Sequence, residues 1–416
     1  MGRRRGGDGS RRPRVPLGGA FWVLWTASTV SFLGDGLFYG SVPLLAASLT
    51  RDPRLISAMD ALTMLGWLLL GLVSGVLVDR WRRTAVMWRV DALRAAITAV
   101  FAGLVLTGHY TIALVLAVSF VLGLAAPFFD NASSSAVPEM VAAPALERAN
   151  SWLQTSILLC ANLVGPPLGA ALFVLDKGVP VSIDAASFVA ASALVYRLRG
   201  LGRAAEPAQR RALRHELREG LVFLFRHRLL RSLCALLGVV NGITGGVIAV
   251  LVLYVLEVLH LHQIAFGWLV AVFAVGGLLG AVMAPWAGRA VPLSVSVLGA
   301  STVFGLGILV LGLWPSLPLV VAAFVVTGVA STAWNVLTIS VRQRIVPAGL
   351  LGRVTSAYRM VGFAAMPLGA VGAGFLADLT SLRTTYVVGG LLLLAATALA
   401  VPSIRSGARE IRPAAG

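Results

Sequence analysis

The feature that most constrains the fold of this sequence is a stretch of roughly 20 apolar residues, the length that an α-helix needs to cross a membrane. Such stretches recur along almost the whole chain of 416 residues. Charged residues make up only 12% of the sequence, whereas a soluble domain contains roughly 25%. We therefore predict an all-α membrane protein with about twelve transmembrane helices in two pseudo-symmetric six-helix bundles.

The longest polar stretch of the chain separates the sixth predicted span from the seventh and marks the boundary between the bundles. A short repeat supports a duplication, because the sequence PLGA at 167–170 returns at 367–370, each time in the fifth span of its set. The predicted domains are a basic tail over 1–19, a bundle over 20–198, a linker over 199–230, a second bundle over 231–402 and a tail over 403–416.

The net charge of +17 comes from arginines that gather in alternate loops. This is the pattern of the positive-inside rule and not of a continuous nucleic-acid-binding face. Only Arg51, Arg54, Lys177 and Arg383 fall on the opposite side. The pattern predicts a multi-pass protein of the cell membrane, with both termini in the cytoplasm and no nucleic-acid partner.

The linker shows helical periodicity, with leucines on one side and arginines on the other. We predict an amphipathic helix on the inner leaflet, attracted to anionic lipid. A solvated basic linker without a lipid role is the alternative. The leucines are Leu213, Leu217, Leu221 and Leu224, and the arginines are Arg210, Arg211, Arg214 and Arg218.

The loop after the second predicted span runs from Gly75 to Arg83 with the sequence GVLVDRWRR. It resembles the signature loop of the major facilitator superfamily. A glycine there permits close helix approach, and the acid and arginines can form ion pairs. The resemblance implies a cytoplasmic gate in which Asp79, Arg80 and Arg83 meet an acid at the end of the fourth span. Asp130 has the matching place, and a solvated helix-end residue is the alternative.

The fifth predicted span contains Gly165, Pro166 and Gly169 in a pattern that resembles the antiporter motif of the same superfamily. Proline removes a backbone hydrogen bond and glycine permits tight contact, so a deformable helix is expected. An ordinary kinked span is the alternative. Many proton-coupled drug exporters of the superfamily carry an arginine in the fourth span, and this chain has none there. The resemblance therefore leaves proton coupling open.

Asp35 is the outstanding polar residue inside a predicted span. A charge at mid-membrane costs roughly 2.5 to 3.5 kcal/mol on insertion scales and usually faces the bundle interior. We predict that Asp35 carries a proton or cation, while a structural bond to a neighbouring helix is the alternative. The predicted residues of the substrate cavity, which the resemblance places between the bundles, are Ser31, Tyr39, Asn241, Ser331 and Asn335.

Other charged residues in apolar stretches have structural interpretations. Asp60 resembles the end of a capping box at a helix start, and Asp184 lies in the first turn of the sixth span. Asp91 and Arg94 are one turn apart in the third span and neutralise each other. Glu257 and two nearby histidines lie at the outer mouth, where a solvated loop is expected and no metal site.

The pattern resembles the drug-exporter branch that includes macrolide-efflux and siderophore-exporter proteins. We expect a monomeric secondary transporter that exports small amphipathic organic compounds, with the proton gradient as its energy source and no cofactor. Uptake or uncoupled facilitation of a solute is one alternative, and a non-transporting scaffold or sensor is another. An enzyme is not expected, since no P-loop, catalytic triad or HExxH motif is visible.

Overall fold

The computed structural model describes residues 16–199, 213–347 and 349–410, and these residues are almost entirely helical, with no strand among them. The helices of the first bundle are α1 (Gly19–Leu49), α2 (Pro53–Arg80), α3 (Arg83–Leu106), α4 (Ile112–Met140), the continuous set η1 (Ala143–Ala145), α5 (Leu146–Ser156), η2 (Ile157–Val164) and α6 (Gly165–Leu175), and α7 (Val179–Tyr196). After α8 (Leu213–Arg226) the second bundle contains α9 (Arg228–Leu253) with η3 (Tyr254–Val258), α10 (Ile264–Ala290), α11 (Leu293–Leu313), α12 (Leu317–Ile345), α13 (Leu351–Leu379) and α14 (Leu382–Glu410).

Eleven helical segments of the described chain are long and apolar enough to cross a membrane. α3 has sufficient length as well, but it carries Arg89, Asp91 and Arg94. It packs against α7 and α4 inside the first bundle. The prediction of an all-α protein with about twelve spans is therefore confirmed.

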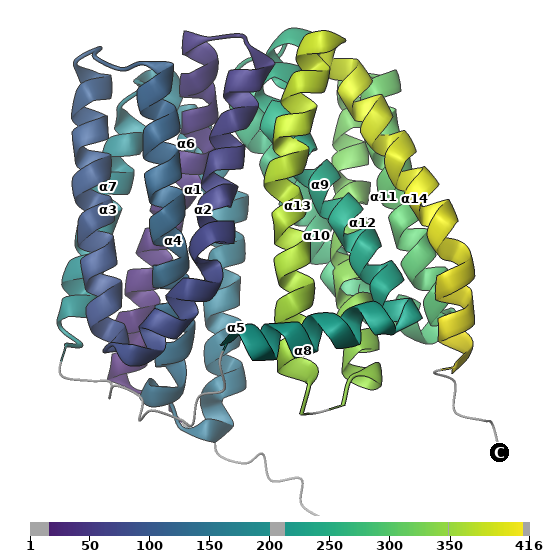
Figure 1. Ribbon diagram of the computed structural model, residues 1–416. Coiled ribbons are helices and arrows are strands. Elements are labelled where there is room, and N and C mark those ends of the chain that lie inside the picture. The colour runs from purple at the N-terminus through teal and green to yellow at the C-terminus, as the bar shows by residue number, and fades with distance from the viewer. Residues whose placement is uncertain (1–15, 200–212, 348, 411–416) are drawn as a thin grey trace, which may run out of the picture.

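The two bundles stand side by side in Figure 1, with α8 running across one end. The first turn of α1 and the last turn of α14 lie at that same end, which we call the terminal end; the turn between α1 and α2 lies at the opposite, distal end. The bundles meet where α2 packs along α13 and where α10 packs along α6 and η2.

The first bundle is built on a close crossing of α1 with α6. A Cβ atom added to Gly36 would lie 2.8 Å from the Cα of Gly165, and one added to Gly40 would lie 2.6 Å from the Cα of Pro166. Real side chains do not fit at such distances, so the crossing depends on glycine. The preceding turns are π-helical, which agrees with the loss of amide donors at Pro166 and Pro167.

The second bundle repeats this crossing between α9 and α13. A Cβ atom added to Gly369 would lie 2.6 Å from the Cα of Gly242, and one added to Gly245 would lie 3.1 Å from the Cα of Met366. The repeated PLGA sequence thus has the same structural role in both bundles.

Three predicted helix ends were wrong. α2 begins at Pro53 and is capped by Asp52, whose side chain accepts from the Arg54 amide at 2.8 Å, so Asp60 lies inside the helix. α4 continues through a polar segment to Met140, and Asp130 is therefore an interior residue. α7 begins at Val179, so Asp184 also lies beyond the first turn.

α8 confirms a helix in the second part of the linker. It packs on α13 and α9, with Leu224 fully buried and Glu219 paired with Arg353. Arg210 and Arg211 lie outside the described residues. Contact of this helix with anionic lipid stays a prediction.

The α1–α6 crossing predicts opposite effects for two Gly→Ala substitutions. A Cβ atom at Gly165 would lie 2.5 Å from the Cα of Gly36, whereas one at Gly103 in α3 meets no atom within 4 Å. Gly165→Ala should destabilise the protein by about 1 to 3 kcal/mol through overpacking. Gly103→Ala should be neutral or stabilising by up to about 1 kcal/mol, because alanine favours the helix. Thermal unfolding of the purified variants in detergent measures both, and equal stability of the two would contradict the tight crossing.

Candidate functional site

A cavity of about 660 Å³ lies between the two bundles and is lined by residues of α1, α2, η2 and α9 to α12. Its walls are mostly apolar. Its size and character suit an organic molecule with one polar group. The polar side chains in the lining are Asp35, Tyr39, Asn162, Thr244, Thr327 and Thr332.

The predicted cavity residues divide into two groups. Tyr39 lines this cavity, whereas Ser31, Asn241, Ser331 and Asn335 do not. Ser31 is fully buried within the first bundle. Asn241 faces α13, because a Cβ atom on Gly362 would lie 3.0 Å from its amide nitrogen. These four residues lie on helices that line the cavity, but they are not part of its lining.

Asp35 forms an ion pair with Arg94 of α3. The Asp35 side chain is 35% exposed and lines the cavity, whereas Arg94 is 4% exposed. The guanidinium carbon of Arg94 also lies 4.0 Å from the centre of the Phe188 ring. The Asp35 carboxylate therefore faces the cavity on one side and contacts the buried Arg94 guanidinium on the other.

Arg94 has further acids around it. Its Nη1 lies 3.6 Å from Oδ1 of Asp91 on the same helix. Asp130 of α4 and Asp184 of α7 are within electrostatic range of the guanidinium. Asp184 sits against α1, since a Cβ atom on Gly34 would lie 2.5 Å from its Oδ1. We call Asp35, Asp91, Arg94, Asp130 and Asp184 the Arg94 cluster.

The sequence predicted the pairing of Arg94 with Asp91 but not its contact with Asp35. Asp91 and Arg94 do form an ion pair one helical turn apart, at 3.6 Å, and Arg94 also donates a hydrogen bond to Asp35. The available signal was a charged pair in the middle of a membrane-spanning helix, where each charge needs a partner from the bundle interior.

The predicted gate does not form as expected around Asp130. Arg83 forms an ion pair with Glu139 near the end of α4, whereas Asp130 belongs to the Arg94 cluster. The difference arises because α4 is longer than predicted and Glu139 occupies its end. Arg80 is exposed, and the Asp79 side chain lies outside the described part of the structure.

The helix α2, which precedes the signature loop at Gly75 to Arg83, is hydrogen-bonded to α4 through the side-chain amide of Asn131. Asn131 donates to the Gly71 carbonyl at 3.2 Å and to the Ser74 hydroxyl at 2.8 Å. A Cβ atom on Gly75 would lie 4.0 Å from the same nitrogen. Gly75 therefore stands near an α2–α4 contact, but the space there would admit a small side chain.

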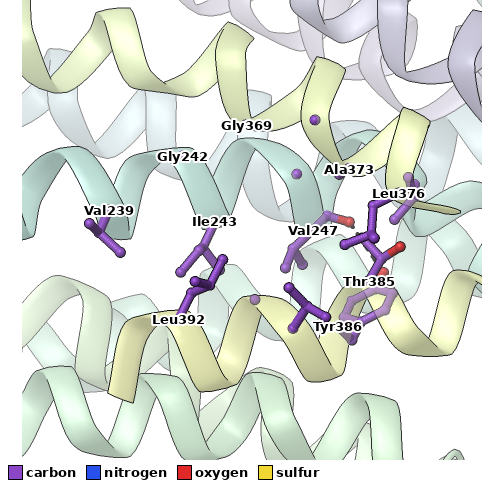
Figure 2. Close-up of a pocket in the computed structure, with 15 residues that line it drawn as sticks. Val239, Gly242, Ile243, Val247, Gly369, Ala373, Leu376, Thr385, Tyr386 and Leu392 are labelled. Carbon is purple, nitrogen blue, oxygen red and sulfur yellow. Dashed lines mark hydrogen bonds between the residues drawn. The ribbon is translucent and has the colours of Figure 1, made fainter. Parts of the chain in front are cut away.

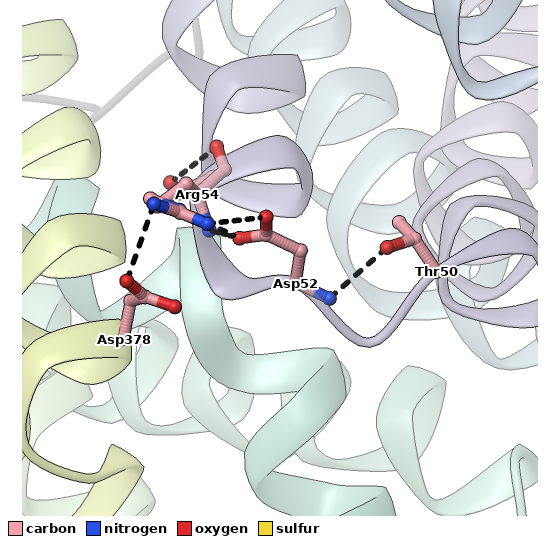
Figure 3. A network of polar contacts seen from close by, with 5 residues as sticks. Thr50, Asp52, Arg54 and Asp378 are labelled. Carbon is pink, nitrogen blue, oxygen red and sulfur yellow. Dashed lines mark hydrogen bonds and ion pairs between the residues drawn. The ribbon is translucent and has the colours of Figure 1, made fainter.

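The bundles are joined by ion pairs at the distal end (Figure 3). Arg54 of α2 lies 3.3 Å from Asp378 of α13 and 3.0 Å from Asp52. The hydrogen bond from Arg54 holds the pKa of Asp52 below its ordinary value. Arg51 adds a longer pair with Glu257, at 3.8 Å.

The backbones of α2 and α13 also approach closely at this end. A Cβ atom on Gly374 would lie 2.9 Å from the carbonyl oxygen of Pro53. A second close approach joins α10 to α6, where a Cβ atom on Gly267 would lie 2.8 Å from the Cα of Pro167. The distal end is therefore the closed end of the interface between the bundles.

A separate crevice of about 400 Å³ lies between α9, α13 and α14 (Figure 2). Its polar groups belong to Thr385 and Tyr386, and the Tyr386 hydroxyl donates to the Val247 carbonyl at 3.2 Å. The lining contains no charged side chain. The crevice therefore offers no group for ion coupling, unlike the central cavity.

The sequence profile of the transmembrane secretion effector family matches residues 15–410. The multidrug efflux pump Tap of Mycobacterium tuberculosis is 29% identical over 95% of this chain and 93% of its own length. Macrolide efflux protein A of Streptococcus pyogenes is 21% identical over 90% of this chain and 93% of its own length.

Solved structures share the fold. A bacterial homologue of the human lysosomal transporter Spinster has a TM-score of 0.73, with 14% identity over 95% of this chain and 98% of its own. A bacterial homologue of the iron transporter ferroportin has a TM-score of 0.69, with 18% identity over 94% of this chain and 98% of its own. The chain therefore belongs to the transmembrane secretion effector family of the major facilitator superfamily, and it is a membrane transporter and not an enzyme.

Proposed function

We propose that this transporter exports small amphipathic organic compounds by alternating access and that protons exchanged at Asp35 drive the export. The observation that carries the proposal is the position of Asp35, which lines the central cavity and is paired with the buried Arg94. A group in this place can exchange a proton with water in the cavity and also alter the packing of the first bundle.

The ion pair supplies a physical link between protonation and conformation. Separating a buried arginine from its carboxylate leaves an uncompensated charge, which costs about 3 to 5 kcal/mol. A proton on Asp35 therefore changes the relative stability of arrangements that differ in the position of α1. Because α1 crosses α6 closely and α6 contacts α10 of the other bundle, such a change reaches the interface between the bundles.

The cavity and the relatives support the substrate class. The apolar walls of the cavity suit the hydrophobic part of a ligand, and Asn162, Thr244 and Thr327 offer hydrogen bonds. The relatives are named as a multidrug efflux pump and a macrolide efflux protein. We infer an amphipathic ligand of the same general kind.

The arginine pattern and the closed distal end support export. With the terminal end in the cytoplasm, as the positive-inside rule predicts, the bundles are closed on the outer side. A cavity closed toward the outside accepts its ligand from the cytoplasm or from the inner leaflet. An exporter loads in this state and an importer releases in it, so the choice of export rests on the relatives that are named as efflux proteins.

Asp35→Asn should abolish proton-driven export, because an amide cannot exchange the proton. Cells that express the wild type should accumulate less of at least one compound from a panel of fluorescent amphiphiles. Cells with Asp35→Asn should accumulate as much as cells without the protein. Asp176→Asn is the control, because Asp176 lies in the loop after α6 and, among the described residues, its side chain accepts a hydrogen bond from the Gly178 amide alone. If neither expression nor collapse of the proton gradient changes accumulation of any compound, the proposal fails.

The distal ion pair predicts a shift in the balance between open and closed states. Arg54 and Asp378 are partly exposed, so removing either charge should weaken closure only modestly and increase distal opening up to about fivefold. Labelling of a cysteine at Thr244 by an impermeant maleimide outside intact cells measures opening, in a background free of native cysteines. Arg54→Gln and Asp378→Asn should each increase the labelling rate, and the double variant should add little.

Arg383→Gln is the matched control for this experiment. Arg383 also lies at the distal end, but it donates to the Gly312 and Leu313 carbonyls within its own bundle. It should leave the labelling rate unchanged. Additive effects of Arg54→Gln and Asp378→Asn would show that the pair does not hold the bundles together.

A further inference from the structure

Arg94 stands between two carboxyl groups of different exposure. It is hydrogen-bonded to Asp35, and its Nη1 is 3.6 Å from Oδ1 of Asp91. The Asp91 side chain is fully buried, and neither of its oxygens has a hydrogen-bond partner among the described residues. The arginine therefore has a second acid at ion-pair distance to which it makes no hydrogen bond.

The charges around Asp91 do not balance if every acid is ionised. Asp130 of α4 and Asp184 of α7 face it from the helices packed on α3, and Asp35 approaches from α1. Arg94 is the cation of this group. One positive charge would then face four negative charges, and each uncompensated buried ion costs several kcal/mol. The cluster is stable when the acid bonded to Arg94 is ionised and the buried acids beside it are neutral.

The same argument applies when Asp35 binds a proton. Arg94 is 4% exposed, so it cannot exchange its lost partner for water. Asp91 is on the same helix and already forms an ion pair at 3.6 Å, so a rotation of side chains is enough to convert this contact into a hydrogen bond. Asp184 is less suitable, because no described cation lies within 4.0 Å of its carboxylate, whereas Arg94 lies 3.6 Å from Asp91.

We propose that Arg94 pairs alternately with Asp35 and Asp91, and that each of these carboxyl groups carries a proton while the other holds the arginine. This inference rests on the proposed proton coupling at Asp35 and adds Asp91 as a second proton-exchange residue. When Asp35 takes up a proton from the cavity, Arg94 moves to Asp91, which releases its own proton. That proton passes to water by way of Asp130, which is only half-buried. The number of protons in the cluster stays constant.

Infrared spectroscopy of the purified full-length protein at neutral pH tests the alternation without a transported compound, because a protonated carboxyl group absorbs apart from an ionised one. The wild type should show the band of neutral Asp91, which Asp91→Asn removes. Asp35→Asn should lose the same band, since Arg94 then holds an ionised Asp91. The variant with both substitutions should lose no further band. Retention in Asp35→Asn of the band that Asp91→Asn removes would overturn the proposal.

Two further variants control for misfolding and for wrong assignment of the infrared band. Asp91→Glu keeps a carboxyl group and should shift the band without removing it, which identifies the band even if Asp91→Asn does not fold. Asp60→Asn removes an acid of α2 outside the Arg94 cluster and should leave the Asp91 band in place.

Transport separates this inference from the function on which it rests. With the fluorescent compound whose export requires Asp35, Asp91→Asn in proteoliposomes should lose transport driven by a pH gradient but retain exchange of compound for compound. Damage to the fold would reduce both. Normal export by Asp35→Asn would defeat the proposed function itself. Lost export by Asp35→Asn with a retained Asp91 band would defeat only the alternation.

Discussion

The crossing of α1 with α6 is the contact on which the candidate site depends. Gly36 and Gly165 let the two backbones meet without side chains between them, and Asp35 lies one residue before this point. The crossing therefore fixes the height and orientation of the carboxylate that faces the cavity. Because α6 also touches α10 of the second bundle, the helix that holds Asp35 is mechanically connected to the interface that opens and closes.

The Arg94 cluster contains a buried guanidinium, which is energetically costly without a partner. Arg94 pairs with Asp35, next to the α1–α6 crossing. A buried guanidinium is stable only beside a carboxylate, and Asp35 and Asp91 both lie within ion-pair distance. The second bundle repeats the glycine crossing but buries a different arginine, Arg342, against the ring of Tyr358. The duplication thus preserved the helix packing, while acids around a buried arginine characterise the first bundle.

Much of the architecture follows from the sequence because lipid leaves few choices. Apolar stretches of membrane length must be helical, and the arginines between them indicate which loops share a side. The PLGA repeat indicated the duplication, and the mid-span position of Asp35 indicated a residue of functional interest. Helix ends were less predictable: the polar residues after Asp130 suggested a loop, yet α4 continues to Met140 because its polar face contacts α2 through Asn131.

The sequence by itself determined the helical membrane fold, the duplication and the candidate role of Asp35. Only the tertiary structure decided that Arg94 of α3 pairs with Asp35, that Glu139 is a partner of Arg83, and which polar residues line the cavity. The physical reason is that helical periodicity tells which residues share a face, but not which neighbouring helix that face meets. Partners far apart in the chain are chosen by the packing of whole helices, and here that packing depends on a few glycines.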